Sequence, residues 1–72
     1  MKQFKEHLRS IRKNSGATQR QVADGVEITE RNYQYYESGE REPSMATLIA
    51  LADYFDVSLD YLVGRSDDPA RR

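Results

Sequence analysis

Arginine, glutamine and serine side chains gather on one side of the segment 29–38. At 100° per residue on an α-helix, Arg31, Gln34 and Ser38 project within about 60° of one another. Arg31 could hold guanine O6 and N7 in a bidentate fork, Gln34 suits adenine, and Glu30, at the flank, could accept from cytosine N4. The spacing therefore indicates a helix whose outer side suits hydrogen bonding to base edges in the major groove.

The inner side of the same segment is aromatic. Tyr33 and Tyr36 share a face with Thr29, so we expect the two tyrosines to anchor the helix against a core. Thr29 is the expected N-cap, and the helix should end at 38–39. Tyr35 projects outward, where either contact with the groove or plain exposure to solvent is open to it.

Two further helices are predicted before this segment. Phe4, Leu8 and Ile11 recur at i, i+4 and i+7 and predict an amphipathic helix that ends near Gly16. Thr18-Gln19-Arg20-Gln21 is a capping box that opens the second helix. A short helix, a tight turn and a second helix with a polar outer side form a helix-turn-helix. The small Ala23 would let the two helices cross closely.

The remainder of the chain predicts two more helices and a tail. Ser44 and Ser58 are N-cap candidates followed by leucines at helical spacing, and Gly64 ends the last helix. We therefore predict an all-α, compact five-helix bundle over residues 1–64, with the helix-turn-helix in its second and third helices. Residues 65–72 are polar with nothing to bury, and we expect a disordered tail.

Composition excludes several classes of protein. The 72 residues contain no cysteine, which rules out disulfides and thiolate metal sites, and His7, expected on the surface, cannot build a metal site alone. The apolar stretches are far shorter than the roughly 20 residues that span a bilayer, and the N-terminus lacks the apolar region of a signal peptide. A nucleophile–base pair and a glycine-rich phosphate loop are missing too. We expect a soluble, cytoplasmic protein that is not an enzyme, without cofactor, metal, membrane partner or evident small-molecule effector.

The net charge of −1 hides an uneven distribution. Residues 1–34 hold seven Lys/Arg against four acids, a net of +3, whereas residues 35–72 hold four Arg against eight acids, a net of −4. A nucleic-acid partner would meet the face that carries the positive half. Basic residues of the predicted first helix and just before it are also consistent with a simply solvated face: Lys2, Lys5, Arg9 and Lys13.

Several stretches over residues 3–64 resemble the Cro and phage-repressor-like helix-turn-helix regulators, the XRE family. Their order and spacing carry the resemblance, which implies a lambda-repressor-like DNA-binding fold. It also implies sequence-specific binding of double-stranded DNA by a transcriptional regulator, with repression favoured over activation. The stretches are Leu8-Arg9-Ser10-Ile11-Arg12, Gly16-Ala17-Thr18-Gln19, Val22-Ala23, Ile28-Thr29, residues 36–44 and residues 51–62.

The resemblance also implies roles for individual residues. Arg12 and Glu37 match a pair that holds the first and third helices together. Independently of the resemblance, Lys13 and Asn14 lie near the entrance to the second helix, where they are placed to reach phosphate. The other positions that match DNA contacts are Thr29, Glu30, Arg31, Gln34 and Tyr35 toward bases, and Gln19, Arg20, Ser38 and Arg41 toward phosphates.

Three acids depart from the family pattern. Glu27 stands in the turn where the family usually has glycine, and it would be strained by about 1 kcal/mol if φ there is positive. Glu30 puts a negative charge on the groove face, and Glu40 stands where a lysine is common. These departures keep an alternative open, in which the fold serves as a protein-interaction module with weak or no DNA binding.

A dimer is expected from the size of the domain. One module buries about 600–1,000 Å² against DNA, which is too little for tight specific binding, so the resemblance implies a homodimer on a palindromic operator. The helix after Ser58 and the tail are the expected dimer surface. The partly outward apolar residues Tyr54, Tyr61 and Val63 are candidates for it, and Asp53, Asp56 and Asp60 are assigned to helix capping and solvation.

Overall fold

The computed structural model describes residues 4–70, and these form five α-helices and no strand. The predicted all-α, five-helix architecture is confirmed. Residues 1–3, which include Lys2, and residues 71–72 of the predicted tail lie outside the described residues. The helices are α1 (Phe4–Ser15), α2 (Gln19–Gly25), α3 (Glu30–Ser38), α4 (Met45–Phe55) and α5 (Leu59–Leu62).

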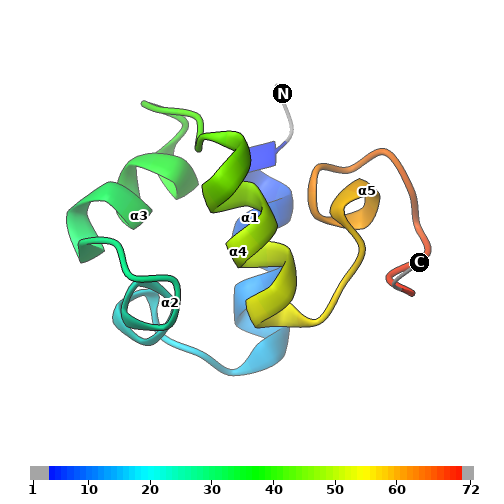
Figure 1. Cartoon of the computed structure of the whole chain (residues 1–72), viewed down its shortest axis with the longest axis horizontal. Coiled ribbons are helices and arrows are strands. Elements are labelled where there is room, and N and C mark those ends of the chain that lie inside the picture. Colours follow the sequence, from blue (N-terminus) through cyan, green and yellow to red (C-terminus); the bar gives the residue numbers. More distant parts are fainter. Residues whose placement is uncertain (1–3, 71–72) are drawn as a thin grey trace.

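The arrangement places α2 and α3 together on one side of a central pair of helices (Figure 1). The central pair is α1 and α4, and α5 lies on its other side. Packing follows this layout, because α1 contacts α3, α4 and α5 while α2 contacts α3 and α4. The helix-turn-helix is therefore supported along one edge by α1 and α4.

Side-chain caps start the helices where the sequence predicts them. Thr18 and Gln21 form the complete capping box, with Gln21 N donating to Thr18 Oγ1 at 3.0 Å and Thr18 N donating to Gln21 Oε1 at 2.9 Å. Thr29, Ser44 and Ser58 each accept from a backbone N–H three residues on, which satisfies one donor left open at a helix start. The predicted N-caps are confirmed.

The core lies between α1, α4 and the helix-turn-helix. Tyr33 is fully buried as predicted, and Tyr36 is partly buried against the same core. Ala23 is fully buried in α2, which leaves room for the close crossing of α3. The other fully buried large side chains are Leu8, Val22, Leu51 and Leu62.

His7 differs from the expectation of a surface residue. It is half-buried, and its ring meets the ring of Tyr61 edge-on with 5.0 Å between centroids. The reason is that α5 packs against α1 and brings Tyr61 over this position, which the pattern of α1 alone could not show.

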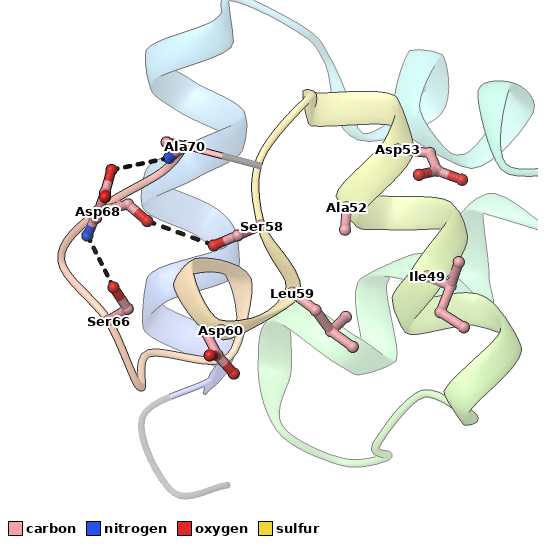
Figure 2. A pocket seen from close by; sticks show the side chains of 9 residues that line it. All are labelled: Ile49, Ala52, Asp53, Ser58, Leu59, Asp60, Ser66, Asp68 and Ala70. Carbon is pink, nitrogen blue, oxygen red and sulfur yellow. Dashed lines mark hydrogen bonds between the residues drawn. The ribbon is translucent and has the colours of Figure 1, made fainter. Parts of the chain in front are cut away.

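Residues 65–70 fold back along α5. Arg65 N donates to the carbonyl of Asp60 at 2.8 Å, and Ser58 N donates to the carbonyl of Pro69 at 3.0 Å. The Ser58 hydroxyl donates to the carbonyl of Asp68 at 3.4 Å, as Figure 2 shows. The division at residue 64 into a folded domain and a disordered tail stays a prediction.

The turn between α2 and α3 carries strain at Glu27. Its φ is +62°, in the left-handed region that disfavours side chains other than glycine. The turn is held by hydrogen bonds from Glu27 N to the carbonyl of Asp24 and from Ile28 N to the carbonyl of Ala23. Glu27 therefore has the positive φ that the family's usual glycine at this position would adopt.

We expect Glu27→Gly to raise the free energy of unfolding by less than about 1 kcal/mol, since the left-handed penalty disappears while part of the gain is lost to glycine's extra freedom when unfolded. Urea denaturation measures the change. Glu27→Ala is the matched control, because it removes the same carboxylate and keeps the Cβ. Equal gains in both variants would attribute the effect to charge and contradict the backbone explanation.

Candidate nucleic-acid interface

The helix α3 has buried side chains on one face and exposed polar side chains on the other. Tyr33 is fully buried and Glu37 is only 2% exposed, so both point into the domain. Arg31 and Gln34 are exposed on the outer side. The buried anchors leave the hydrogen-bonding face of α3 free to meet a partner.

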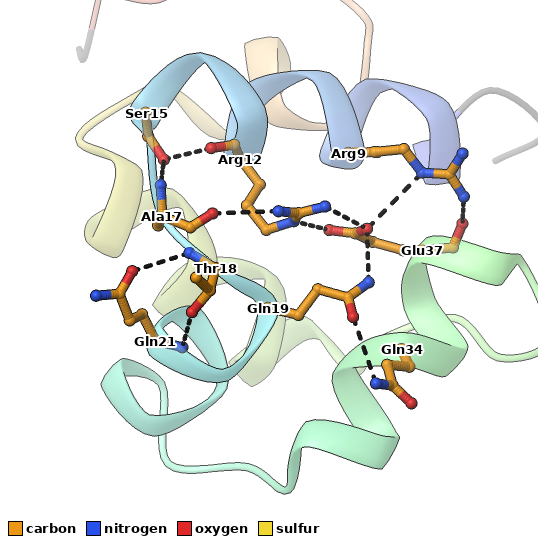
Figure 3. Close-up of polar contacts among 9 residues, drawn as sticks. All are labelled: Arg9, Arg12, Ser15, Ala17, Thr18, Gln19, Gln21, Gln34 and Glu37. Carbon is orange, nitrogen blue, oxygen red and sulfur yellow. Dashed lines mark hydrogen bonds and ion pairs between the residues drawn. The ribbon is translucent and has the colours of Figure 1, made fainter.

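An ion pair fixes α3 to α1. Arg12 Nε donates to Glu37 Oε2 at 2.6 Å and Arg12 Nη2 donates to Glu37 Oε1 at 3.2 Å, the bidentate geometry that makes such pairs strong (Figure 3). Arg12 Nη1 also donates to the carbonyl of Ala17 at 3.1 Å. One guanidinium thus joins α1, the loop before α2, and α3, which is the pairing that the resemblance implied.

The charges of this pair are stabilised by each other. Burial acts to raise the pKa of Glu37, but hydrogen bonds from Arg12 and Gln19, together with the nearby Tyr33 hydroxyl, outweigh it and hold the pKa below its ordinary value. The hydrogen bond to Glu37 raises the pKa of Arg12 against its own burial. Burial, with the Glu37 carboxylate beside it, raises the pKa of Tyr33, whose hydroxyl has no hydrogen-bond partner of good geometry in the described part of the chain.

A pH dependence of stability follows from the lowered pKa of Glu37. A carboxyl group that is more acidic in the folded state stabilises the fold at pH values above its ordinary pKa of 4.5, and the contribution is lost as pH falls through the lower pKa of the folded state. We expect Glu37→Gln to flatten the fall in stability over this acidic window, measured by urea denaturation at several pH values. Glu40→Gln, an exposed acid on the adjoining loop, is the control and should leave the slope unchanged.

Gln19 connects this buried pair to the outer face of α3. Its Nε2 donates to Glu37 Oε1 at 3.0 Å, and its Oε1 accepts from Gln34 Nε2 at 3.3 Å (Figure 3). Gln34, which is expected to face bases, is therefore hydrogen-bonded to Gln19, which is expected to face phosphate. Gln19 is half-buried and engaged inside the domain, and its role at a phosphate stays a prediction.

Most of the remaining predicted contact residues are exposed. Thr29 also caps α3, with Asn32 N donating to its hydroxyl at 3.1 Å, so it has a structural role whatever it contacts. Tyr35 is half-buried rather than fully outward, and the Arg41 guanidinium lies 4.7 Å from its ring centroid. The exposed residues are Lys13, Asn14, Arg20, Thr29, Glu30, Arg31, Gln34, Ser38 and Arg41.

Arg9 has a contact that the sequence reasoning missed. Its Nη2 donates to the carbonyl of Glu37 at 3.3 Å and its Nε lies 3.8 Å from Glu37 Oε1, although the side chain is 53% exposed. A cation at the last turn of α3 also complements the helix dipole. The available signal was the i, i+3 spacing of Arg9 and Arg12, which puts both on one side of α1.

The departing acids are all exposed near this surface. Glu27 lies in the turn, Glu30 in the first turn of α3 and Glu40 just after its last turn. Glu30 has a favourable structural role as well, because a negative charge at a helix N-terminus complements the dipole. The interface therefore combines exposed arginines with acids that restrict which partner it can meet.

The sequence of this chain is similar to those of known transcriptional regulators. A Bacillus subtilis protein named Uncharacterized HTH-type transcriptional regulator YqaE is 46% identical over 66 residues, which cover 90% of this chain and 57% of that protein. The cryptic phage CTXphi transcriptional repressor RstR of Vibrio cholerae is 44% identical over 62 residues, covering 86% of this chain and 55% of the repressor. The chain thus spans little more than half the length of these relatives.

Solved structures agree with these relatives. The crystal structure of the P22 c2 repressor protein in complex with a synthetic operator matches with a TM-score of 0.81 and 27% identity, covering 88% of this chain and 96% of that chain. A transcriptional regulator from Listeria innocua matches with a TM-score of 0.81 and 39% identity, covering 92% of this chain and 62% of that chain. A family model for helix-turn-helix domains matches residues 8–62. The chain belongs to this helix-turn-helix family, in the Cro and phage-repressor-like (XRE) group that its motifs indicated.

Proposed function

We propose that the domain binds double-stranded DNA at specific sequences, with α3 in the major groove, and acts as a transcriptional regulator, most simply a repressor. Such a regulator works where the DNA is, so we place it in the cytoplasm. In the part of the chain that the structure describes, no helix is both long and apolar enough to span a bilayer.

One observation carries the proposal. The network from Arg12 through Glu37 and Gln19 to Gln34 fixes the inner side of α3, so that its outer side is set before any partner arrives. A helix with side chains is about 10–12 Å across and fits the major groove, which is about 12 Å wide. Hydrogen-bonding groups held in place lose little freedom on binding, and this favours selective contacts with base edges.

The test is a salt titration of binding to a duplex selected from a random DNA pool. Each phosphate that is neutralised contributes about −0.9 to the slope of log K against log[salt]. We expect a steep negative slope for the wild type. Arg20→Ala, which removes an exposed cation on α2, should reduce the steepness by about one unit for each protomer.

A flat salt dependence, or selection of no duplex at all, would overturn the proposal. That outcome would favour the protein-interaction alternative, which the exposed acids Glu27, Glu30 and Glu40 motivate.

We further propose that the active species is a homodimer on a palindromic operator. The apolar side chains Met45 and Ile49 are 63% and 48% exposed on α4, which is a costly surface to leave in water. Figure 2 shows Ile49 of α4 and Leu59 of α5 lining one groove, which is also lined by Ser66, Asp68 and Ala70. This surface includes the helix and the segment that the sequence predicted for dimer contact.

Ile49→Glu tests the dimer, since a charge there opposes apolar contact but leaves a half-exposed position foldable. We expect sedimentation equilibrium to shift toward monomer and binding to a full palindrome to weaken, while binding to an isolated half-site stays the same. Lys13→Glu changes an exposed residue of α1 that does not line this groove, and it should leave the sedimentation unchanged. An unaltered dimer in Ile49→Glu would place the contact elsewhere.

A further inference from the structure

The loop that follows α3 is fastened to one backbone carbonyl. The carbonyl oxygen of Tyr35 accepts from Gly39 N at 3.0 Å, from Arg41 N at 3.4 Å and from the Ser38 hydroxyl at 3.1 Å. Gly39 allows this turn, since its φ is +84°. The backbone of Arg41 is thereby held next to Tyr35, although the loop continues in irregular structure.

The side chains of the same two residues are also joined. The Arg41 guanidinium lies 4.7 Å from the centroid of the Tyr35 ring, within the range of a cation–π contact. Tyr35 is half-buried and Arg41 is exposed, so the ring forms the inner layer and the guanidinium the outer one. A guanidinium stacked on an aromatic face keeps its N–H groups free at the edges for hydrogen bonding.

The stack matters because of what else surrounds Arg41. Glu40 precedes it in the chain and is an exposed carboxylate able to draw a mobile arginine toward itself. An unrestrained arginine side chain also loses on the order of 2 kcal/mol of rotamer entropy when it is fixed on a partner. Stacking on Tyr35 keeps the guanidinium on the α3 side and removes part of that cost before binding.

We propose that Tyr35 is a positioning residue, which acts through Arg41 by presenting its guanidinium to a phosphate beside the groove that α3 occupies. This assignment rests on the DNA-binding function proposed above. It differs from the base-facing role expected for Tyr35, because a stacked ring that works through arginine contributes to every duplex alike and does not need its hydroxyl.

The test is a double-mutant cycle on duplex affinity with Tyr35→Leu, Tyr35→Phe and Arg41→Ala. We expect Tyr35→Leu to weaken binding by about two- to five-fold, the range of an exposed cation–π contact, and equally for the selected operator and a scrambled duplex. Tyr35→Phe keeps the ring and should bind like the wild type. Arg41→Ala should lower the salt slope by about one unit per protomer, and adding Tyr35→Leu to it should cost nothing more.

NMR of the protein without DNA checks the stack itself. The side-chain resonances of Arg41 should be shifted by the ring current in the wild type and in Tyr35→Phe, and should return to ordinary positions in Tyr35→Leu. Thermal melts of all variants confirm that each is folded.

Three results would overturn this role while leaving DNA binding intact. In the first, Tyr35→Leu still weakens duplex binding in the Arg41→Ala background. In the second, Tyr35→Phe weakens binding as much as Tyr35→Leu does. In the third, Tyr35→Leu weakens binding to the operator only, which would mark Tyr35 as a base contact. Binding of no duplex by the wild type would instead overturn the DNA-binding function, and this role with it.

Discussion

Glu37→Gln is expected to lower the free energy of unfolding by about 3 kcal/mol, the lower end of the range for breaking a buried ion pair from one side. Glutamine fits the same space but leaves the Arg12 guanidinium, whose side chain is only 14% exposed, without its counter-charge. The Ala17 carbonyl, which accepts from Arg12, and the neutral amide of Gln19 cannot replace a bidentate carboxylate. Urea denaturation at neutral pH measures the loss.

Two controls separate the ion pair from general damage to α3. Arg9→Gln removes the other cation near Glu37, but its side chain is 53% exposed, so we expect a change below about 1 kcal/mol. The double variant Arg12→Met with Glu37→Leu leaves no unpaired charge in the interior, since Arg9 remains about half exposed to solvent, and it should recover much of the loss. A small effect of Glu37→Gln, or no recovery in the double variant, would show that the pair is not what fastens α3 to α1.

The helices and their caps could be predicted from local chemistry. Thr18, Thr29, Ser44 and Ser58 each cap a helix whose apolar residues recur at helical spacing, and both signals lie within a few residues of one another. The positive φ of Glu27 was also foreseen as a condition of the turn. Such features depend on neighbours in the chain, which the sequence displays directly.

The side-chain contacts between helices were harder to predict from the sequence. The hydrogen bond from Gln34 to Gln19 joins residues 15 apart, and that from Arg9 to the Glu37 carbonyl joins residues 28 apart. The stack of Arg41 on Tyr35 depends on the turn at Gly39. These contacts depend on helix crossing and on one choice of rotamer for long side chains, and no spacing rule determines either of them. The sequence could indicate which residues face outward, but not which of them are engaged with one another.

Arg31→Ala is expected to weaken binding to the selected operator by about 1–3 kcal/mol, or roughly 5- to 150-fold, if Arg31 forms a bidentate contact with a guanine. Arg31 is exposed in the second position of α3 and is not part of the described core, so the variant should unfold like the wild type. Binding to a scrambled duplex should change much less. Electrophoretic mobility shifts at constant salt measure both.

A modified base makes the assignment specific to atoms. In 7-deazaguanine the N7 acceptor is replaced by a C–H, so the wild type should lose affinity when this base stands at the guanine that Arg31 reads, whereas Arg31→Ala should be insensitive to the exchange. Arg20→Ala is the matched control. If Arg20 binds phosphate as proposed, its removal should weaken every duplex alike and leave the sensitivity to the modified base intact. If Arg31→Ala weakened binding to all duplexes equally, Arg31 would be assigned to the DNA backbone and not to a base. Specificity would then have to come from Gln34, whose orientation the Gln19 tether already sets, or from the shape of the DNA.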